Sequence, residues 1–201
     1  MKTFAVGHTL LQEQRAIHCT HTSRATGTRR CGRQCSHRSA ATLRRHTANG
    51  QSPIKARQKY EATRQVQVFT CGLIVSPSNP WLGCSPDGVL FDGGRPAKLL
   101  EIKCPTKGQT MSAKALLATC DFLQKDDAGI YMLKVHHTHY AQVQLGMALL
   151  DVRTCDLVVY ADFDNSIEIL SVGLDEAFLW SLLTKVKNVY FERILLVLCS
   201  C

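Results

Sequence analysis

Three residues between positions 83 and 105 have the side chains needed for metal-assisted hydrolysis. Asp87 lies in a Ser-Pro-Asp-Gly turn, and Glu101 and Lys103 form a Glu-x-Lys pair at the end of an apolar run. Two carboxylates, together with carbonyl and water oxygens, suit Mg²⁺, which keeps several waters and favours phosphate oxygens. Such an ion polarises a scissile phosphate and lowers the pKa of an attacking water, while a lysine orients that water or offsets developing charge.

The strands expected around these residues bring them to one edge of a sheet. Residues 89–91 and 97–104 read as two strands joined by a tight turn at 92–94, where both glycines accept positive φ. Side chains alternate along a strand, so Glu101 and Lys103 emerge together on one face, opposite an apolar face that should be interior. A Glu-x-Lys pair is also common on solvated strand faces, so these residues alone leave a purely structural role open.

The rest of the pattern predicts a sheet flanked by helices. Helical spacing marks one kind of element, and runs of β-branched or aromatic residues bounded by turn residues mark the other. Helices are expected over residues 54–65, 111–123 and 139–151 and after a cap at Asp175, with further strands over 68–76, 130–135, 157–161 and 167–172. This order of elements predicts an α/β (α+β) fold.

Charge is divided unevenly along the chain. Residues 1–67 contain 13 Lys and Arg against 2 Asp and Glu, a net charge of +11, whereas residues 68–201 contain 11 against 14, a net charge of −3. Residues 14–53 have almost no large apolar side chains, and such a segment cannot bury enough surface to offset its ordering entropy. We therefore expect a basic, disordered tail over residues 1–52 and a folded domain over residues 53–201. A basic arm suits a polyanion such as nucleic acid, although a tail of this composition need not bind anything.

The ten cysteines do not form the pattern of a disulfide framework. Five of them lie singly in or beside apolar runs of the folded part, where free cysteine behaves as a small hydrophobe, and no pair has C-x-x-C spacing. An intracellular location, nuclear or cytoplasmic, therefore follows more easily than secretion. A zinc-binding module in the tail is an alternative, although its spacing matches no usual structural site. Its ligands would be Cys19, Cys31, Cys35, His37 and His46.

Neither end of the chain carries a recognisable export or membrane segment. Residues 1–14 lack a continuous apolar core of signal-peptide length, and the apolar run at 194–199 is far too short to cross a bilayer. We therefore expect a soluble protein with no membrane partner.

The segments that flank the Asp87 turn resemble a known nuclease family. Four motifs occur in the family's order, GLIVSPSNPWLGCSPDGVL, LLEIKCP, HYAQVQLGMALLD and LVVYADFD, and the resemblance runs from about residue 54 to about residue 192. The chain is similar to the YqaJ-type viral recombinase domain, which resembles phage lambda exonuclease and belongs to the PD-(D/E)XK nuclease superfamily. The resemblance implies a restriction-endonuclease-like fold, with a mixed central sheet flanked by helices.

The resemblance also implies roles for individual residues. Asp87 and Glu101 match the two metal carboxylates, the backbone carbonyl of Ile102 a further metal ligand, and Lys103 the catalytic lysine. Gln142, the first glutamine of the AQVQ segment, matches the glutamine that the family places beside that lysine. The implied cofactor is Mg²⁺, with Mn²⁺ as a substitute.

Two questions stay open around this implied centre. Gln142 and Gln144 lie about 200° apart on a helix, so only one of them can face the site, and helical geometry does not choose between them. Ser85, Tyr140 and Lys134 are candidate substrate contacts. A tyrosine at this position is more often a packing residue, and Lys134 has the features of an ordinary surface lysine. The histidines that precede the AQVQ segment are not assigned to a metal site, because the carboxylates already explain the chemistry.

The chain departs from the family pattern at one place. The family's first helix carries a glycine followed shortly by a glutamate that faces the active site. Here Gly50 is followed by Gln51, Ser52 and Pro53, and Glu61 comes too late. The departure implies either weaker binding of metal or of DNA ends, or an N-terminal segment that is not the natural one.

The function expected from these features is that of a Mg²⁺-dependent DNA nuclease. The resemblance favours an exonuclease that acts on the ends of double-stranded DNA in repair or recombination, and analogy with the phage enzyme implies a ring-shaped homotrimer. The alternative is a catalytically impaired nucleic-acid-binding domain derived from a viral or mobile-element recombinase.

Overall fold

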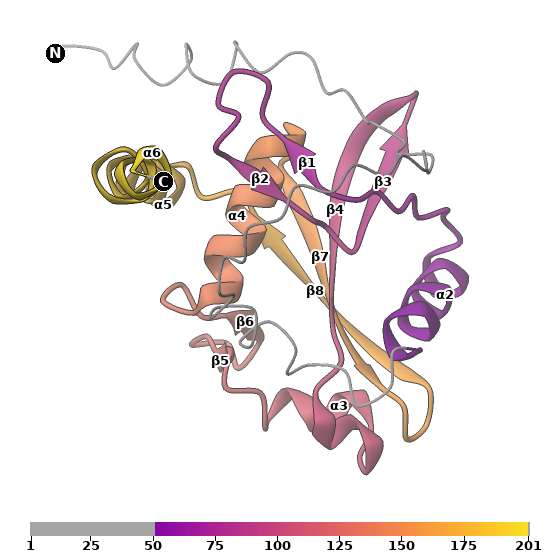
Figure 1. Cartoon of the computed structure of the whole chain (residues 1–201). Coiled ribbons are helices and arrows are strands. Elements are labelled where there is room, and N and C mark those ends of the chain that lie inside the picture. The colour runs from indigo at the N-terminus through magenta and orange to yellow at the C-terminus, as the bar shows by residue number, and fades with distance from the viewer. Residues whose placement is uncertain (1–50, 201) are drawn as a thin grey trace, which may run out of the picture.

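A computed structural model describes residues 51–200 of the chain (Figure 1). All but the last two residues of the predicted N-terminal tail lie outside the described residues, as do the five candidate zinc ligands.

The centre of the fold is a four-stranded mixed sheet. It consists of β3 (Gly88–Asp92), β4 (Arg95–Lys103), β7 (Thr154–Ala161) and β8 (Ser166–Gly173), in the order β3-β4-β7-β8. The outer pairs are antiparallel, whereas β4 and β7 run parallel. The mixed sheet with flanking helices confirms the predicted α+β class.

Helices cover both faces of this sheet, so its two central strands are apolar on both faces. One face packs against α4 (Thr138–Leu150) and the short helix α3 (Ala113–Leu117), and the other packs against α2 (Ser52–Arg64) (Figure 1). The alternation along β4 and β7 divides their side chains between two cores. The α4 side contains Leu99, Cys155, Leu157 and Val159, and the α2 side contains Leu100, Ile102, Val158 and Tyr160.

The predicted hairpin between β3 and β4 is confirmed. Its two turn residues, Gly93 and Gly94, have φ of +54° and +79°, as a tight turn between twisted strands requires. The first pair of the ladder joins Gly88 to Leu100. The last three residues of β4 therefore extend beyond the end of β3, and this overhang is where the candidate site forms.

The strand predicted over residues 68–76 forms only in fragments. Phe69 makes an isolated bridge to Val89, and β1 (Ile74–Val75) pairs with β2 (Gly83–Cys84) outside the main sheet. Residues 68–76 are largely apolar, but side chains such as Leu73, which is 69% exposed, do not pack in a hydrophobic core. Local β-propensity therefore did not produce a full strand, because no neighbouring strand continues alongside it.

The helix predicted over residues 111–123 is also shorter than expected. Only α3 is helical; the Thr119 hydroxyl donates to the Leu116 carbonyl where the helix ends. The chain then forms β5 (Leu123–Lys125), which pairs with β6 (Tyr131–Leu133). A 3₁₀ turn, η1 (Thr106–Gln109), connects β4 to this region.

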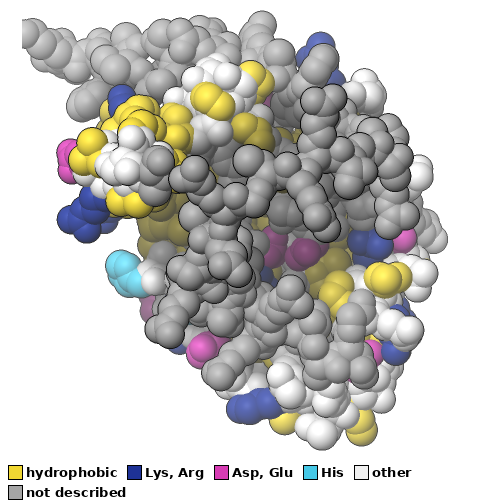
Figure 2. All heavy atoms as spheres, in the orientation of Figure 1, with side chains coloured by type: hydrophobic (Ala, Val, Ile, Leu, Met, Phe, Trp, Pro, Cys, Tyr) yellow, Lys and Arg dark blue, Asp and Glu magenta, His cyan; other side chains and the backbone are white. Residues whose placement is uncertain are grey.

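The C-terminal segment begins as predicted. Asp175 caps α5 (Glu176–Val189) by accepting a hydrogen bond from the Phe178 N–H at 2.9 Å. The helix continues through a π turn, η2 (Tyr190–Ile194), into α6 (Leu195–Cys199). Hydrophobic side chains gather on the surface over α5 and α6 (Figure 2). No helix within residues 51–200 is both long enough and apolar enough to cross a membrane.

Two polar contacts hold α2 against the sheet, one near each end of the helix. The Tyr60 hydroxyl donates to Asp156 Oδ2 at 2.8 Å, and Lys98 Nζ donates to Asp156 Oδ1 at 3.0 Å. At the start of the helix the Ser52 hydroxyl donates to Asp162 Oδ2. Asp156 is buried, and loss of Tyr60 or Lys98 would leave its charge with fewer partners, which is costly. The bond from Tyr60 therefore gives α2 a defined position on the sheet.

We predict that Gly88→Ala destabilises the protein, because a Cβ at this position would lie 2.3 Å from Val68 Cγ1. Valine has few accessible rotamers, so relief requires a backbone shift. The free energy of unfolding from urea titrations should fall by about 1–3 kcal/mol, the usual effect of overpacking. Gly72→Ala is the matched control, since a Cβ there meets no described atom within 4 Å. Equal stability of the two variants would contradict the prediction.

Candidate active site

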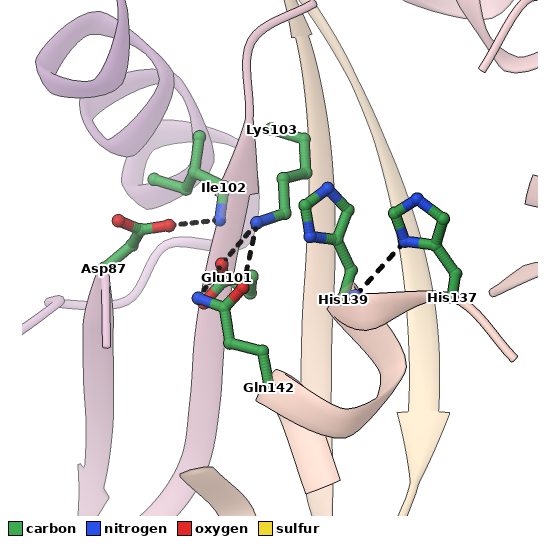
Figure 3. Close-up of polar contacts among 7 residues, drawn as sticks. All are labelled: Asp87, Glu101, Ile102, Lys103, His137, His139 and Gln142. Carbon is green, nitrogen blue, oxygen red and sulfur yellow. Dashed lines mark hydrogen bonds and ion pairs between the residues drawn. The ribbon is translucent and has the colours of Figure 1, made fainter. Parts of the chain in front are cut away.

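The site forms where β4 extends beyond β3. In place of a strand, the Asp87 side chain accepts a hydrogen bond through Oδ2 from the Ile102 N–H at 2.7 Å (Figure 3). The N–H and C=O of one strand residue point to the same edge of the strand. The carbonyl of Ile102 is therefore directed toward the edge where Asp87 lies.

Glu101 lies at the centre of a three-residue network on the α4 side of the strand. Its Oε1 accepts hydrogen bonds from Lys103 Nζ at 2.6 Å and from Gln142 Nε2 at 2.7 Å (Figure 3). Lys103 Nζ also donates to Gln142 Oε1 at 3.4 Å. Glu101 is 3% exposed, and the Lys103 side chain is 16% exposed. The helix therefore supplies an amide that joins the carboxylate to the ammonium group.

The structure separates the two glutamines of α4. Gln142 joins the network around Glu101, whereas Gln144 is fully buried on another side of the helix. Its Nε2 donates to the Gly173 carbonyl at 2.9 Å, and its Oε1 accepts from the Asp175 N–H at 2.8 Å. Gln144 thus links α4 to the connection between β8 and α5, and Gln142 is the glutamine that lies beside Lys103.

Burial dominates the electrostatics of both carboxyl groups. It raises the pKa of Glu101, and the nearby Asp87 charge adds to this effect, against the opposing influence of Lys103 and Gln142. Burial also raises the pKa of Asp87, although the Ile102 N–H, Lys103 and Arg57 act in the opposite direction. A cation between the carboxylates would relieve this shared penalty.

The oxygens of the two carboxylates match the preferences of a hard divalent cation. Among residues 51–200, no hydrogen bond reaches Asp87 Oδ1 or Glu101 Oε2. Within the same range no cluster of three or more His, Cys, Asp or Glu side chains could hold a metal ion. A cation at this site would therefore depend on two carboxylates, supplemented by a carbonyl and water, which is a donor set that Mg²⁺ accepts.

The three predicted substrate contacts lie in different surroundings. Ser85 is exposed and precedes Asp87 by two residues. The Tyr140 hydroxyl instead donates to Asp175 Oδ2 at 3.0 Å, and its ring meets Phe178 edge-on with centroids 4.8 Å apart. Lys134 Nζ donates to a backbone carbonyl, that of Asp121, at 2.5 Å. Ser85 thus keeps an exposed position in the turn that contains Asp87, whereas Tyr140 and Lys134 make packing and loop contacts.

The histidines before the AQVQ segment support the start of α4. His137 Nδ1 accepts a hydrogen bond from the His139 N–H at 3.1 Å, which caps the helix that carries Gln142 (Figure 3). At the start of α2, where the family pattern places an acid, Ser52 donates to Asp162. Sequence reasoning also missed Arg57, whose charge acts on Asp87. Helical spacing marked residues 54–65 as a helix, but nothing in the sequence showed which flank faces Asp87.

We predict that the metal-free protein loses stability as the pH rises through the range in which the two carboxyls ionise. Because burial raises the pKa of Asp87 and Glu101 in the folded state, the unfolded chain releases these protons first, and unfolding becomes easier as the pH rises. Below the unfolded values both states are protonated and the penalty is absent. Asp87→Asn, whose amide oxygen can still accept from Ile102, should flatten this dependence and unfold at a higher temperature at neutral pH.

Thermal unfolding in chelator over a series of pH values measures this effect. A metal-free Asp87→Asn variant that unfolds below the parent at neutral pH would contradict the prediction.

Comparison with known proteins shows which family and which solved structures the chain is similar to. A family model described as the YqaJ-like viral recombinase domain matches residues 33–152. The crystal structure of an alkaline exonuclease (LHK-Exo) from Laribacter hongkongensis is similar, with a TM-score of 0.52 and 27% identity over 69% of this chain and 63% of that chain. LHK-Exo in complex with dAMP gives a TM-score of 0.43 and 25% identity over 71% and 70% of the two chains. The chain thus spans somewhat less than two thirds of the first exonuclease structure, and no curated protein matches it.

Proposed function

The chain belongs to the YqaJ-like viral recombinase domain family, and from this membership we propose that it is an intracellular, Mg²⁺-dependent DNA exonuclease. The family and the likeness to an alkaline exonuclease support a nuclease with a role in recombination. The finer proposal is digestion of double-stranded DNA from its ends. The observation that carries the proposed metal-dependent hydrolysis is the meeting of Asp87, Glu101, Lys103 and Gln142 at the overhang of β4.

We assign the binding of the metal to the acidic half of this group. Asp87 and Glu101 would hold Mg²⁺, with the carbonyl of Ile102 as a further ligand. When bound, the ion supplies Lewis-acid polarisation of the scissile phosphate and a water of lowered pKa. Both carboxyls must be ionised to bind a cation, so their burial makes metal affinity depend on pH.

Lys103 and Gln142 position the attack on phosphorus. Lys103 Nζ is held between Glu101 and Gln142, so its remaining proton can be directed at a water or at a phosphate oxygen. The oxygen of that water forms a bond to phosphorus and gives up a proton to solvent, while the bond to the leaving deoxyribose oxygen breaks and that oxygen takes up a proton from solvent. The ammonium charge offsets the negative charge that develops on the phosphate. The exposed hydroxyl of Ser85 is the substrate contact that we retain.

A second candidate function is that of a nucleic-acid-binding domain without catalysis. The observation that favours it is the start of α2, where Ser52 stands near the position at which the family carries an acid. Strongly salt-dependent DNA binding without any metal-dependent cleavage would support this second function.

We predict that the protein digests linear duplex DNA in the presence of Mg²⁺, leaves covalently closed circles intact and stops when a chelator is added. Asp87→Ala and Lys103→Ala should each lower the rate by roughly 100-fold or more, the usual effect of removing one group that stabilises developing charge. Lys185→Ala, which removes an exposed lysine from α5, is the matched control and should digest DNA at the parental rate. Parental activity in Lys103→Ala would rule out the assigned role, and cutting of circles would show an endonuclease.

Binding of the metal itself gives a separate prediction that does not depend on activity. Mg²⁺ should raise the melting temperature of the parent in a concentration-dependent way, because a ligand of the folded state adds about 2.7 kcal/mol of stability at 100 times its Kd. Asp87→Asn should abolish this shift. Asp127→Asn, a change in an exposed loop, should keep it. Equal shifts in the two variants would place the metal elsewhere.

A further inference from the structure

The helix α2 presents two chemically different flanks beside its buried face. Ala56 and Tyr60 are buried against the sheet. On one flank, Lys55 and Lys59 line a polar hollow of about 440 Å³ together with Asp162, and Lys55 Nζ pairs with Asp162 Oδ1 at 3.3 Å. Since each residue advances the helix by about 100°, Arg57 lies about 200° from both lysines and belongs to the other flank.

The flank that carries Arg57 runs along the segment that leads to Asp87. One turn after Arg57, Glu61 Oε1 accepts a hydrogen bond from the Val68 N–H at 2.8 Å. Val68 packs so closely on Gly88 that no Cβ fits between them, and Gly88 directly follows Asp87. Figure 3 shows α2 as the pale violet helix beside Ile102, which packs in one core with Ala56 and Tyr60 of that helix. The positive charge of Arg57 also lowers the pKa of Asp87 against the larger effect of burial, as expected for neighbouring groups.

Within residues 51–200, no polar contact takes up the hydrogen-bond donors of the Arg57 guanidinium group. Arg57 is half-buried, and it makes no hydrogen bond or ion pair with any other residue in the range 51–200. Its five N–H donors form a planar fork that matches two oxygens of a phosphate. The guanidinium group repels metal ions, so it does not itself add to a cation site at the two carboxylates. It attracts the anionic group that such a cation would bind. A phosphate ester can therefore contact the guanidinium group and the cation at the same time.

We propose that Arg57 binds the non-bridging oxygens of the DNA phosphate that is held at Asp87 and Glu101. This inference rests on the proposed nuclease function and adds a phosphate-binding residue from α2 to the site. The contacts of Tyr60 with Asp156 and of Ser52 with Asp162 fix the helix on the sheet, so the backbone that carries Arg57 has a defined position before DNA binds. Lys55 and Lys59 face the other way and take no part in this contact.

Binding of a short duplex in the presence of Ca²⁺, measured by fluorescence anisotropy over a range of salt concentrations, tests the inference. Arg57→Ala should weaken binding about tenfold and reduce the slope of log K against log salt by about 0.9, the value for one lost phosphate contact. Arg57→Lys should keep the slope because it keeps the charge, yet should hydrolyse DNA more slowly in Mg²⁺ because it lacks the fork. Lys59→Ala, which loses the same charge from the other flank, should keep both the parental slope and the parental rate.

Three outcomes would overturn the inference. The first is an unchanged salt slope in Arg57→Ala, and the second is an equal loss of slope in Lys59→Ala. The third is full recovery of Arg57→Ala activity at higher pH, which would show that Arg57 acts only by keeping Asp87 ionised. Melting temperatures of the variants check that each is folded, and Arg57→Lys provides a folded comparison if the alanine variant is not.

The binding and cleavage experiments fail independently of each other. A parent that binds DNA with an Arg57-dependent slope but never cleaves it would support the phosphate contact and refute the nuclease. If the parent cleaves DNA and Arg57→Ala leaves the salt slope unchanged, the nuclease function is supported and the phosphate contact of Arg57 is refuted.

Discussion

The hydrogen bond from the Ile102 N–H to Asp87 organises the site, because it replaces the strand partner that β4 lacks beyond Leu100. A carboxylate in that place satisfies a backbone donor and leaves its second oxygen available for other ligands. It also brings an acid from the turn that precedes β3 next to an acid from β4 itself. If β3 were one or two residues longer at this end, a backbone carbonyl would occupy the position, and no carboxylate could reach the edge of the sheet.

This arrangement costs stability, and the surrounding structure offsets that cost. The buried Glu101 and the half-buried Asp87, both with raised pKa, disfavour the folded state when both are ionised. Lys103 and Gln142 compensate part of the charge of Glu101, and the apolar layers on both faces of β4 hold the strand in place. Groups whose ionisation opposes folding are typical of functional sites, where affinity for a ligand takes precedence over stability.

Local sequence patterns predicted which side chains of β4 share a face, but only some of the residues that surround them. Alternation placed Glu101 and Lys103 on one face, and the double-glycine turn predicted the hairpin that positions Asp87. The family resemblance favoured Gln142, but helical spacing did not choose between Gln142 and Gln144, because the contact of Gln144 with Gly173 is not visible in that spacing. The lengths predicted for the strand at 68–76 and the helix at 111–123 were wrong for the same reason, and the role of Tyr140 was left open between packing and substrate contact. Their environment depends on tertiary neighbours, which local propensity does not contain.

The parallel pairing of β4 with β7 has a consequence for the order in which the site is assembled. The bond between Asp87 and Ile102 spans 15 residues and belongs to a hairpin, whereas Gln142 and Glu101 are 41 residues apart and Tyr60 and Asp156 are 96 apart. Contacts of long sequence separation form slowly, because loop closure must precede the gain from packing. A nascent chain can therefore form its pair of acids early, but it has no complete site until β7 has been synthesised and inserted beside β4. The four residues of the candidate site therefore come together only after most of the described fold has emerged.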